Sequence, residues 1–523
     1  MHENEQQSLV LALRNLSLFP HATDDWQLIE THISWVVLCG PYAYKIKKAL
    51  NLGFLDFTTL DKRRFYCEEE LRLNSRLAPE LYLSVVRITG TAQQPQLDGQ
   101  GEAIEYAVKM RRFPQQALLS EMAEHDRLEQ SHIDRIIVQV AEFHLAIPPA
   151  SKESPYGKPQ QVHAPVQENF IQLRELSDNP QHIQWIGLME GWAAEEYQRC
   201  YQAFQQRKQD GFVRECHGDM HLGNMAVIDN VPVIFDGIEF NPDLYWIDVM
   251  SEVAFLFMDL EDHRERQFAF RFLSGYLELT GDYSGLRVLR YYLAYRSIVR
   301  AKIAAIRLTQ HLEVEARSSS LTELQRYLQL ALGYTQIQRP VLCITHGLSG
   351  SGKSTLSAPL AEHMGAIRIR SDRERQRIFG KGKQEGEATK ISAGVYSEDA
   401  TVQTYATLEV LAKEILESGY SLIVDATFLT RSQRESFKQL ADALSVPLRI
   451  LCFHAEPAVL RRRIEARQHE GRDISEADLK VLEHQLEVYA GLDTDELSYS
   501  ITIDTQSRFD IEAILARIIQ TPA

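Results

Sequence analysis

The stretch from Gly347 to Thr355 constrains this 523-residue chain more than any other part of it. It reads Gly-Leu-Ser-Gly-Ser-Gly-Lys-Ser-Thr, which is a glycine, four residues and then Gly-Lys-Ser. The glycines let successive backbone N–H groups turn inward around phosphate oxygens, because no Cβ atom obstructs them. An apolar, β-branched run at 341–345 precedes the stretch, and a helical pattern at 356–364 follows it. A strand, a glycine-rich loop and a helix in this order predict a phosphate-binding loop, for which a flexible Gly/Ser turn is the alternative.

The members of this loop have separate chemical tasks. Lys353 is expected to reach the β- and γ-phosphates of ATP, and Ser354 is expected to ligate Mg²⁺. The following helix would present its N-terminus to the anion. We expect the nucleotide to contact Gly347, Ser349, Gly350, Ser351, Gly352, Lys353, Ser354 and Thr355.

Apolar runs after the loop predict a P-loop domain at residues 336–523, with a five-stranded parallel, doubly wound α/β sheet. Including the run before the loop, the predicted strands are 341–345, 366–370, 421–424, 448–453 and 500–504. Ligands collect at the carboxyl ends of such strands, where Asp372 and Asp425 stand. Asp425 is the expected outer Mg²⁺ partner of Ser354. Asp372 is a candidate base for a substrate hydroxyl, and an N-cap of the next helix is the alternative for it.

An arginine-rich helical stretch follows the fourth of these strands. Its arginines are Arg461, Arg462, Arg463 and Arg467. Such a stretch is typical of the mobile lid of nucleoside-monophosphate-type kinases, whose guanidinium groups neutralise the transferring phosphate. Arg463 and Arg467 are the catalytic candidates, and a solvated charged helix is the alternative. With Ser371-Asp372 and the Val-Asp-Ala-Thr at 424–427, the stretch resembles the polynucleotide-kinase, gluconate-kinase and zeta-toxin group of P-loop kinases.

More than 330 residues precede the loop and have a pattern of their own. A small mixed region comes first, in which we expect a helix at 59–78 and strands at 35–39, 42–47, 83–89 and 105–111. The pattern is helical from about residue 121 to 332, except for a Gly- and Asp-rich section at 217–243. A small mixed lobe followed by a large helical lobe predicts an α+β domain at residues 1–335.

The Gly- and Asp-rich section carries the residue types of phosphoryl transfer. His217-Gly218-Asp219 is followed by Asn224, and a strand at 231–235 ends in Asp236-Gly237. In kinase-like phosphotransferases one Asp accepts the proton of the substrate hydroxyl, while an Asn and a second Asp hold Mg²⁺. A structural cluster of turn residues is the alternative. His221 is expected to pack or to bond within the loop rather than to bind metal.

These spacings resemble the aminoglycoside-phosphotransferase and choline-kinase branch, which has His-Gly-Asp where protein kinases have His-Arg-Asp. The resemblance implies a protein-kinase-like fold, with Asp219 as catalytic base and with Asn224 and Asp236 as Mg²⁺ ligands. It also implies that Asp248 braces the catalytic loop. The chain departs from protein kinases in one respect, because no glycine-rich phosphate loop occurs between Trp26 and Cys39.

The small lobe should supply a lysine for the α- and β-phosphates of ATP and a helix glutamate that holds this lysine. Lys45 and Lys47 lie on one face of a predicted strand, and three consecutive glutamates, 68–70, follow on the next helix. Any Lys–Glu pair among them suits the role. Our preferred pair is Lys45 with Glu69.

Composition limits the possible partners. A formal charge of −16 argues against a protein that binds nucleic acid or anionic membranes over its whole surface. No run approaches the ~18 apolar residues of a membrane span. The cysteines form no Cys-x-x-Cys pair, so we expect reduced core thiols in a cytoplasmic protein.

The whole arrangement resembles bacterial proteins described as bifunctional aminoglycoside phosphotransferase/ATP-binding protein. We therefore expect a kinase with two nucleotide sites that uses ATP and Mg²⁺. The expected acceptor is a hydroxyl-bearing small molecule, a nucleoside or sugar, or a nucleic-acid end. One alternative is a P-loop switch that binds and hydrolyses ATP to control the N-terminal part or a partner. Another is that the N-terminal part is a nucleotide-binding pseudokinase.

Overall fold

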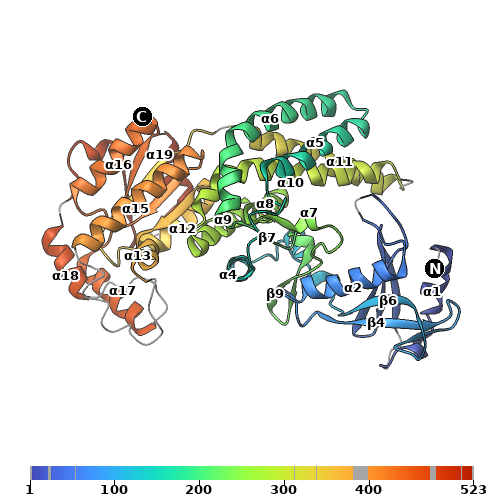
Figure 1. Cartoon of the computed structure of the whole chain (residues 1–523). Helices are drawn as coiled ribbons and strands as arrows, with labels where there is room; N and C mark the ends of the chain where they lie inside the picture. The colour runs from blue at the N-terminus through green and yellow to red at the C-terminus, as the bar shows by residue number, and fades with distance from the viewer. Residues whose placement is uncertain are drawn as a thin grey trace. The chain divides into compact units, whose positions relative to one another are not determined.

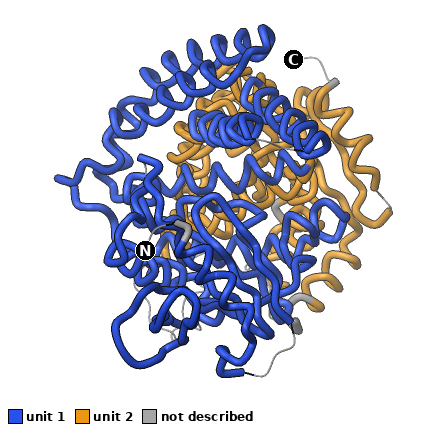
Figure 2. The backbone as a smooth tube through the Cα atoms, turned by 90° about the vertical axis from the view of Figure 1, so that its right-hand side faces the viewer, with its two compact units in different colours: residues 1–263, 291–332 blue, residues 264–290, 333–523 orange. Residues whose placement is uncertain are grey.

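The computed structural model of the chain describes residues 3–21, 25–53, 55–310, 313–336, 338–380, 398–470, 479–489, 491–507 and 509–520. Backbone contacts divide the chain into two compact units, drawn in blue and orange in Figure 2. Unit 1 consists of residues 1–263 and 291–332, and unit 2 consists of residues 264–290 and 333–523. The second division lies close to the expected boundary between 335 and 336. The segment 264–290 departs from that expectation, because its helix packs on the helix that follows the phosphate-binding loop and on the next strand, at 367–370.

The small lobe of unit 1 is built on a six-stranded antiparallel sheet with the order β1-β2-β3-β6-β4-β5. Its strands are β1 (Trp26–Glu30), β2 (Ser34–Cys39), β3 (Tyr42–Lys47), β4 (Tyr82–Gly90), β5 (Pro95–Leu97) and β6 (Ala103–Arg111). Helix α1 (Glu3–Ala12) shares a core cluster with Tyr44 and Ile46 of β3. Because side chains alternate along a strand, Lys45 and Lys47 point to the opposite face, where α2 (Leu60–Asn74) packs.

The larger lobe of unit 1 is mainly helical. Its helices are α3 (Leu119–Glu124), α4 (Gln130–Ala146), α5 (Pro159–Glu175), α6 (Pro180–Gln209), α7 (Pro242–Tyr245), α8 (Val249–Asp262), α10 (Leu286–Leu308) and α11 (Val314–Thr335), the last two of which extend into unit 2 by a few residues. Two short antiparallel pairs interrupt them, β7 (Val213–Glu215) with β10 (Trp246–Asp248) and β8 (Met225–Ile228) with β9 (Val231–Ile234). These pairs frame the Gly- and Asp-rich section, and the predicted kinase-like α+β fold is confirmed.

Unit 2 contains the predicted five-stranded parallel sheet, with the order β12-β13-β11-β14-β15. Its strands are β11 (Leu342–His346), β12 (Ile367–Arg370), β13 (Leu422–Asp425), β14 (Leu448–His454) and β15 (Ser500–Asp504). Its described helices are α9 (Arg266–Thr280), α12 (Lys353–Met364), α13 (Ser371–Phe379), α15 (Glu398–Glu417), α16 (Arg431–Leu444), α17 (Pro457–Glu470), α18 (Leu479–Val488) and α19 (Ile511–Gln520). The phosphate-binding loop leaves the central strand β11 and enters α12, which is labelled in Figure 1. The α/β fold class is therefore confirmed as well.

The remaining global expectations concern cysteines and membranes. The six cysteines form no disulfide, and all are buried except Cys452, which is partly buried. Among the described residues, none of the helices combines the length and the hydropathy that a bilayer crossing requires.

Candidate active sites

Two lysines and one glutamate form the buried centre of the small lobe in unit 1. Lys45 Nζ lies 2.9 Å from Glu70 Oε1, and Lys47 Nζ lies 2.6 Å from Glu70 Oε2. Lys47 also pairs with Glu239, which follows the β8–β9 hairpin. The preferred partner Glu69 was wrong, because Glu69 pairs instead with Arg72 on the more exposed side of α2. Neighbouring side chains on a helix differ by about 100° in direction, so only one of three consecutive glutamates faces the strand.

Charge balance keeps this centre ionised. Burial raises the pKa of Glu70, but Lys45 and Lys47 outweigh burial and lower this pKa to about 2. Burial likewise lowers the pKa of Lys45, yet Asp236 and Glu70 together raise it well above its ordinary value. Lys45 Nζ donates to Asp236 Oδ1 at 2.6 Å. Lys45 therefore links the helix glutamate to the aspartate that is expected to hold Mg²⁺.

The predicted base Asp219 lies in the loop after β7. Asn224 Nδ2 donates to the Asp219 carbonyl and to its Oδ2, each at 3.0 Å, and His221 Nε2 lies 3.4 Å from Oδ2. Burial alone would raise the pKa of Asp219, but His221 and Arg300 more than offset this and leave it well below its ordinary value. The carboxylate is 36% exposed and is ionised at neutral pH, so it offers a lone pair to an approaching hydroxyl. His221 also accepts from Gly223 N through Nδ1, as expected for a loop-bonding histidine.

Two carboxylates of α8 hold the backbone of this loop. Glu252 Oε1 accepts from His217 N at 2.6 Å and from Gly218 N at 2.7 Å. Asp259 Oδ2 accepts from Leu222 N at 2.8 Å. Asp248, the expected brace, does not take this role.

Asp248 instead caps the N-terminus of α8 and accepts a bidentate pair from Arg207, at 2.7 Å each. Glu252, one helical turn after Asp248, holds the loop instead, because Asp248 caps the N-terminus of the helix that carries Glu252.

The two expected metal ligands of unit 1 stand at the same end of the β8–β9 hairpin. Asn224 directly precedes β8, and its carbonyl accepts from Phe235 N at 2.9 Å, next to Asp236. Asp236 has a φ of 61°, a left-handed conformation that is strained for a non-glycine residue, and its carboxylate is 45% exposed. Because the Asn224 amide nitrogen donates a hydrogen bond to Asp219, the amide oxygen points away from Asp219. An amide oxygen and a carboxylate suit a hard cation such as Mg²⁺.

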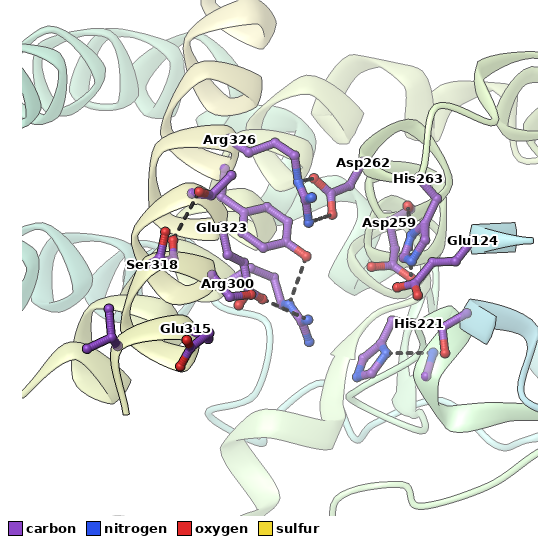
Figure 3. Close-up of a pocket in the computed structure, with 16 residues that line it drawn as sticks. Glu124, His221, Asp259, Asp262, His263, Arg300, Glu315, Ser318, Glu323 and Arg326 are labelled. Atoms are coloured by element: carbon purple, nitrogen blue, oxygen red, sulfur yellow. Dashed lines mark hydrogen bonds and ion pairs between the residues drawn. The ribbon is translucent and has the colours of Figure 1, made fainter. Parts of the chain in front are cut away.

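A polar cavity of about 820 Å³ adjoins the catalytic loop (Figure 3). His221 contributes to its wall, and His221 Nε2 lies 3.4 Å from the carboxylate of the candidate base Asp219. Arg300 Nε donates to Tyr327 Oη at 3.2 Å, and Arg326 pairs with Asp262. Hydroxyls and carboxylates make up most of the remaining lining: Ser120, Glu124, Ser318, Ser319, Thr322 and Glu323. Such a wall suits a polar acceptor.

In unit 2, the phosphate-binding loop has the backbone that its sequence predicts. Gly347, Gly350 and Gly352 have φ values of 148°, 80° and 87°, and a Cβ atom on Gly347 would lie 2.5 Å from the Phe453 carbonyl oxygen. Lys353 Nζ donates to the carbonyl of Gly347 at 2.9 Å, so the cation lies over the loop. The loop therefore fits a phosphate both in its backbone conformation and in its charge.

One loop N–H already has a side-chain acceptor. Ser349 N donates to Gln485 Oε1 of α18 at 2.8 Å. Ser349 and Gln485 both line the cavity of this unit.

The other predicted residues of unit 2 meet at a cavity of about 1430 Å³. Lys353, Ser354, Asp372, Asp425 and Arg463 all line it. Asp425 ends β13, is buried and accepts from Ser357 Oγ at 3.0 Å, and with the Ser354 hydroxyl it offers the oxygen ligands that Mg²⁺ prefers.

Two alternatives for these residues can be decided. Arg370, not Asp372, stands at the N-cap position of α13, so the N-cap alternative for Asp372 is wrong. Arg463 donates to the carbonyl of Gly350 at 3.3 Å and to Thr505, so it contacts the loop instead of being solvated. The side chain of Arg467 lies outside the described residues.

Sequence reasoning missed three carboxylates, Glu239, Glu252 and Asp259, and it kept Glu70 only as an alternative to Glu69. A signal for Glu70 exists in α2, where the buried residues recur at helical spacing as Arg63, Cys67, Glu70 and Asn74. Most of these residues are polar, so the pattern resembles a solvated face until the structure shows what covers it.

The comparison with protein families finds one domain, which lies within unit 2. Residues 342–492 match the family described as AAA domain. The chain is 30% identical over 439 residues to the uncharacterized protein Rv2004c of Mycobacterium tuberculosis, a match that covers 84% of this chain and 85% of that protein.

Several solved structures are similar to one part of the chain or the other. A choline kinase from Cryptosporidium parvum Iowa II is similar to the N-terminal part at 10% identity and a TM-score of 0.38, covering 62% of this chain and 95% of its own. Aminoglycoside 2′-phosphotransferase-IIIa is similar at 12% identity and a TM-score of 0.35, covering 62% of this chain and 98% of its own. A gluconokinase from Sinorhizobium meliloti 1021 is similar to the C-terminal part at 22% identity and a TM-score of 0.26, covering 35% of this chain and 91% of its own. The long match to the mycobacterial protein shows that the chain belongs to the same family as Rv2004c.

Proposed function

We propose that the chain is an ATP-dependent phosphotransferase with a separate nucleotide site in each unit. The observation that carries the proposal is the arrangement in unit 1, where Lys45 joins Glu70 to Asp236 and Asn224 is hydrogen-bonded to Asp219. A purely structural turn cluster would not need a buried lysine that reaches a strained, exposed aspartate.

In unit 1, Asp219 is the base and Lys45 is the cation for the phosphates of ATP. The acceptor oxygen forms a bond to the γ-phosphorus, the bond from that phosphorus to the oxygen of ADP breaks, and the hydroxyl proton passes to Asp219. When bound, Mg²⁺ neutralises charge on the phosphates, and Asn224 and Asp236 would hold it. Glu252 keeps the loop of Asp219 in place through two backbone N–H groups.

In unit 2, Lys353 is the cation for the β- and γ-phosphates, and Asp372 is the base toward a second acceptor. Ser354 and Asp425 would hold Mg²⁺ there. Arg463 lies against the loop, where a guanidinium can stabilise the charge of the transferring phosphoryl group. A switch that only hydrolyses ATP needs neither Asp372 nor Arg463, and their common cavity with Lys353 favours a kinase.

The test is phosphate transfer from [γ-³²P]ATP to a panel of sugars, aminocyclitols, nucleosides and oligonucleotides with free hydroxyl ends. We expect each labelled acceptor to depend on one aspartate only, so that labelling is lost in Asp219→Asn or in Asp372→Asn but not in both. Glu69→Gln is the matched control, because it alters an exposed ion pair of α2. Release of inorganic phosphate without any labelled acceptor, abolished by Lys353→Ala alone, would instead establish the switch.

A further inference from the structure

Helix α9 completes the P-loop unit with a segment that precedes the loop by more than 60 residues. It packs against α12 and β12, and Figure 1 shows it beside α12. Near its C-terminal end it carries Glu278, whose side chain is 10% exposed. A buried carboxylate needs partners, and those of Glu278 lie on the segment that leads to Asp372.

Three guanidinium groups converge on this one carboxylate. Arg373 Nε lies 3.0 Å and Arg370 Nη1 lies 3.4 Å from Glu278 Oε1, and Arg368 Nη2 lies 3.7 Å from Oε2. All three arginines belong to β12 or to the first turn of α13. Glu278 therefore sets the positions of charges along the edge of the P-loop site.

Two of these arginines reach the site itself. Arg370 lines the cavity that also holds Lys353 and Asp372. Arg368 Nη1 donates to the carbonyl of Ser354 at 3.2 Å and lies 4.0 Å from Asp425 Oδ2. Arg368 thus stands between two carboxylates, Glu278 on one side and Asp425 on the other.

We propose that Glu278 is a positioning residue of the P-loop site, which holds Arg370 toward the cavity and keeps Arg368 from closing on Asp425. This inference rests on the function proposed for unit 2. Without the charge of Glu278, the Arg368 guanidinium gains more by pairing with Asp425, which is already at the limit of ion-pair distance. An Asp425 neutralised in this way would be a weaker partner for Mg²⁺.

The test measures the Mg²⁺ requirement of nucleotide binding in the full-length chain. A fluorescent ATP analogue is titrated at a series of Mg²⁺ concentrations, and the P-loop share of the signal is the part that Lys353→Ala removes. We expect Glu278→Gln to raise the half-saturating Mg²⁺ concentration roughly tenfold, the effect of about one partly buried charge. Glu278→Asp keeps the charge and should recover part of this loss.

Two further variants separate positioning from a loss of folding. Arg271→Gln removes an ion pair between the same helix and Glu362 of α12, at 2.6 Å, and should leave the Mg²⁺ requirement unchanged. Adding Arg368→Gln to Glu278→Gln removes the guanidinium that closes on Asp425 and should restore the requirement toward the wild-type value. A merely structural role would make this double variant worse than either single variant.

The outcomes distinguish this inference from the function on which it rests. If the wild-type chain shows no Lys353-dependent binding, the proposed nucleotide site of unit 2 is itself wrong. If that binding exists but Glu278→Gln keeps the wild-type Mg²⁺ requirement, or shifts it no more than Arg271→Gln does, the positioning role is overturned while the nucleotide site stands.

Discussion

The two candidate sites hold their phosphate-directed lysines in different ways. In unit 1, Lys45 of strand β3 is held by Glu70 of helix α2 and by Asp236, which lies in a loop 191 residues later. In unit 2, Lys353 is held by backbone carbonyls of its own loop, such as that of Gly347 six positions earlier. The first lysine is part of a buried network of charges, whereas the second belongs to a local backbone conformation. We therefore expect substitutions in unit 1 to cost both stability and activity, and those in the loop of unit 2 to cost activity alone.

The largest expected effect is on catalysis in unit 1. Asp219→Asn should lower the turnover of that reaction by about 10²- to 10⁴-fold, because it removes the base while the carbonyl oxygen of the new amide keeps the loop geometry. The affinity for ATP should barely change, since Asp219 faces the acceptor. Steady-state kinetics with the acceptor labelled by unit 1 gives kcat and KM separately, and the unit 2 reaction in the same preparation is the control. Near-normal turnover would refute the role of Asp219.

A second experiment asks whether the two lysines serve independent sites. Titration calorimetry with a non-hydrolysable ATP analogue should give two sites per chain, and Lys353→Ala should weaken one of them by at least about 100-fold, since it deletes charged hydrogen bonds to phosphate. The free energy of unfolding should change by less than about 1 kcal/mol.

Asp236→Ala should weaken the other site, and the two effects should add. A single site in the wild-type chain, lost entirely in Lys353→Ala, would move unit 1 to the pseudokinases, and the missing glycine-rich loop would be the first explanation.

The third prediction concerns stability and separates two neighbouring glutamates. Glu70→Ala should lower the free energy of unfolding by about 3–5 kcal/mol, because it leaves Lys45 and Lys47 buried with too few partners. Glu69→Ala, the matched control one residue away, should cost less than about 1 kcal/mol, since its pair with Arg72 is exposed. Urea denaturation of both variants measures the difference. Equal losses would show that the buried network adds nothing to stability.

The smallest expected effect is on the pH dependence of stability. The pKa of Glu70 falls from 4.5 to about 2 on folding, because Lys45 and Lys47 outweigh the effect of burial. The folded chain therefore binds fewer protons than the unfolded chain between these values, and its stability falls as the pH falls through them. Above pH 4.5 the contribution is complete.

Glu70→Gln should flatten this part of the curve, measured as urea midpoints against pH. Lys353→Ala should not flatten it, because the loop of Lys353 is held by carbonyls that do not titrate. If the urea midpoints of Glu70→Gln fell with pH as steeply as those of the wild-type chain, the lowered pKa of Glu70 would be contradicted.

Contiguous features of the protein were predictable from the sequence. The strand at 42–47 has the predicted bounds, and the five strands of the parallel sheet lie within one or two residues of their predicted positions. The phosphate-binding loop and the His-Gly-Asp loop were also found, because their chemistry depends on neighbours a few positions apart. For such features, side-chain periodicity and backbone sterics act within one turn or one loop, and the sequence states them directly.

Which of several chemically similar residues contacts a distant part of the chain is decided only by tertiary packing. Glu69 and Glu70 have the same chemistry and differ only by their direction on α2, so nothing short of the position of β3 selects between them. Glu252 replaces Asp248 as the brace because Asp248 is the N-cap of α8, and Glu252, one turn later, accepts from the loop backbone. Residues 264–290 join unit 2 for a similar reason. Their helix offers Glu278 to arginines about 90 residues later, and a charge pair at that separation leaves no periodic trace in the sequence.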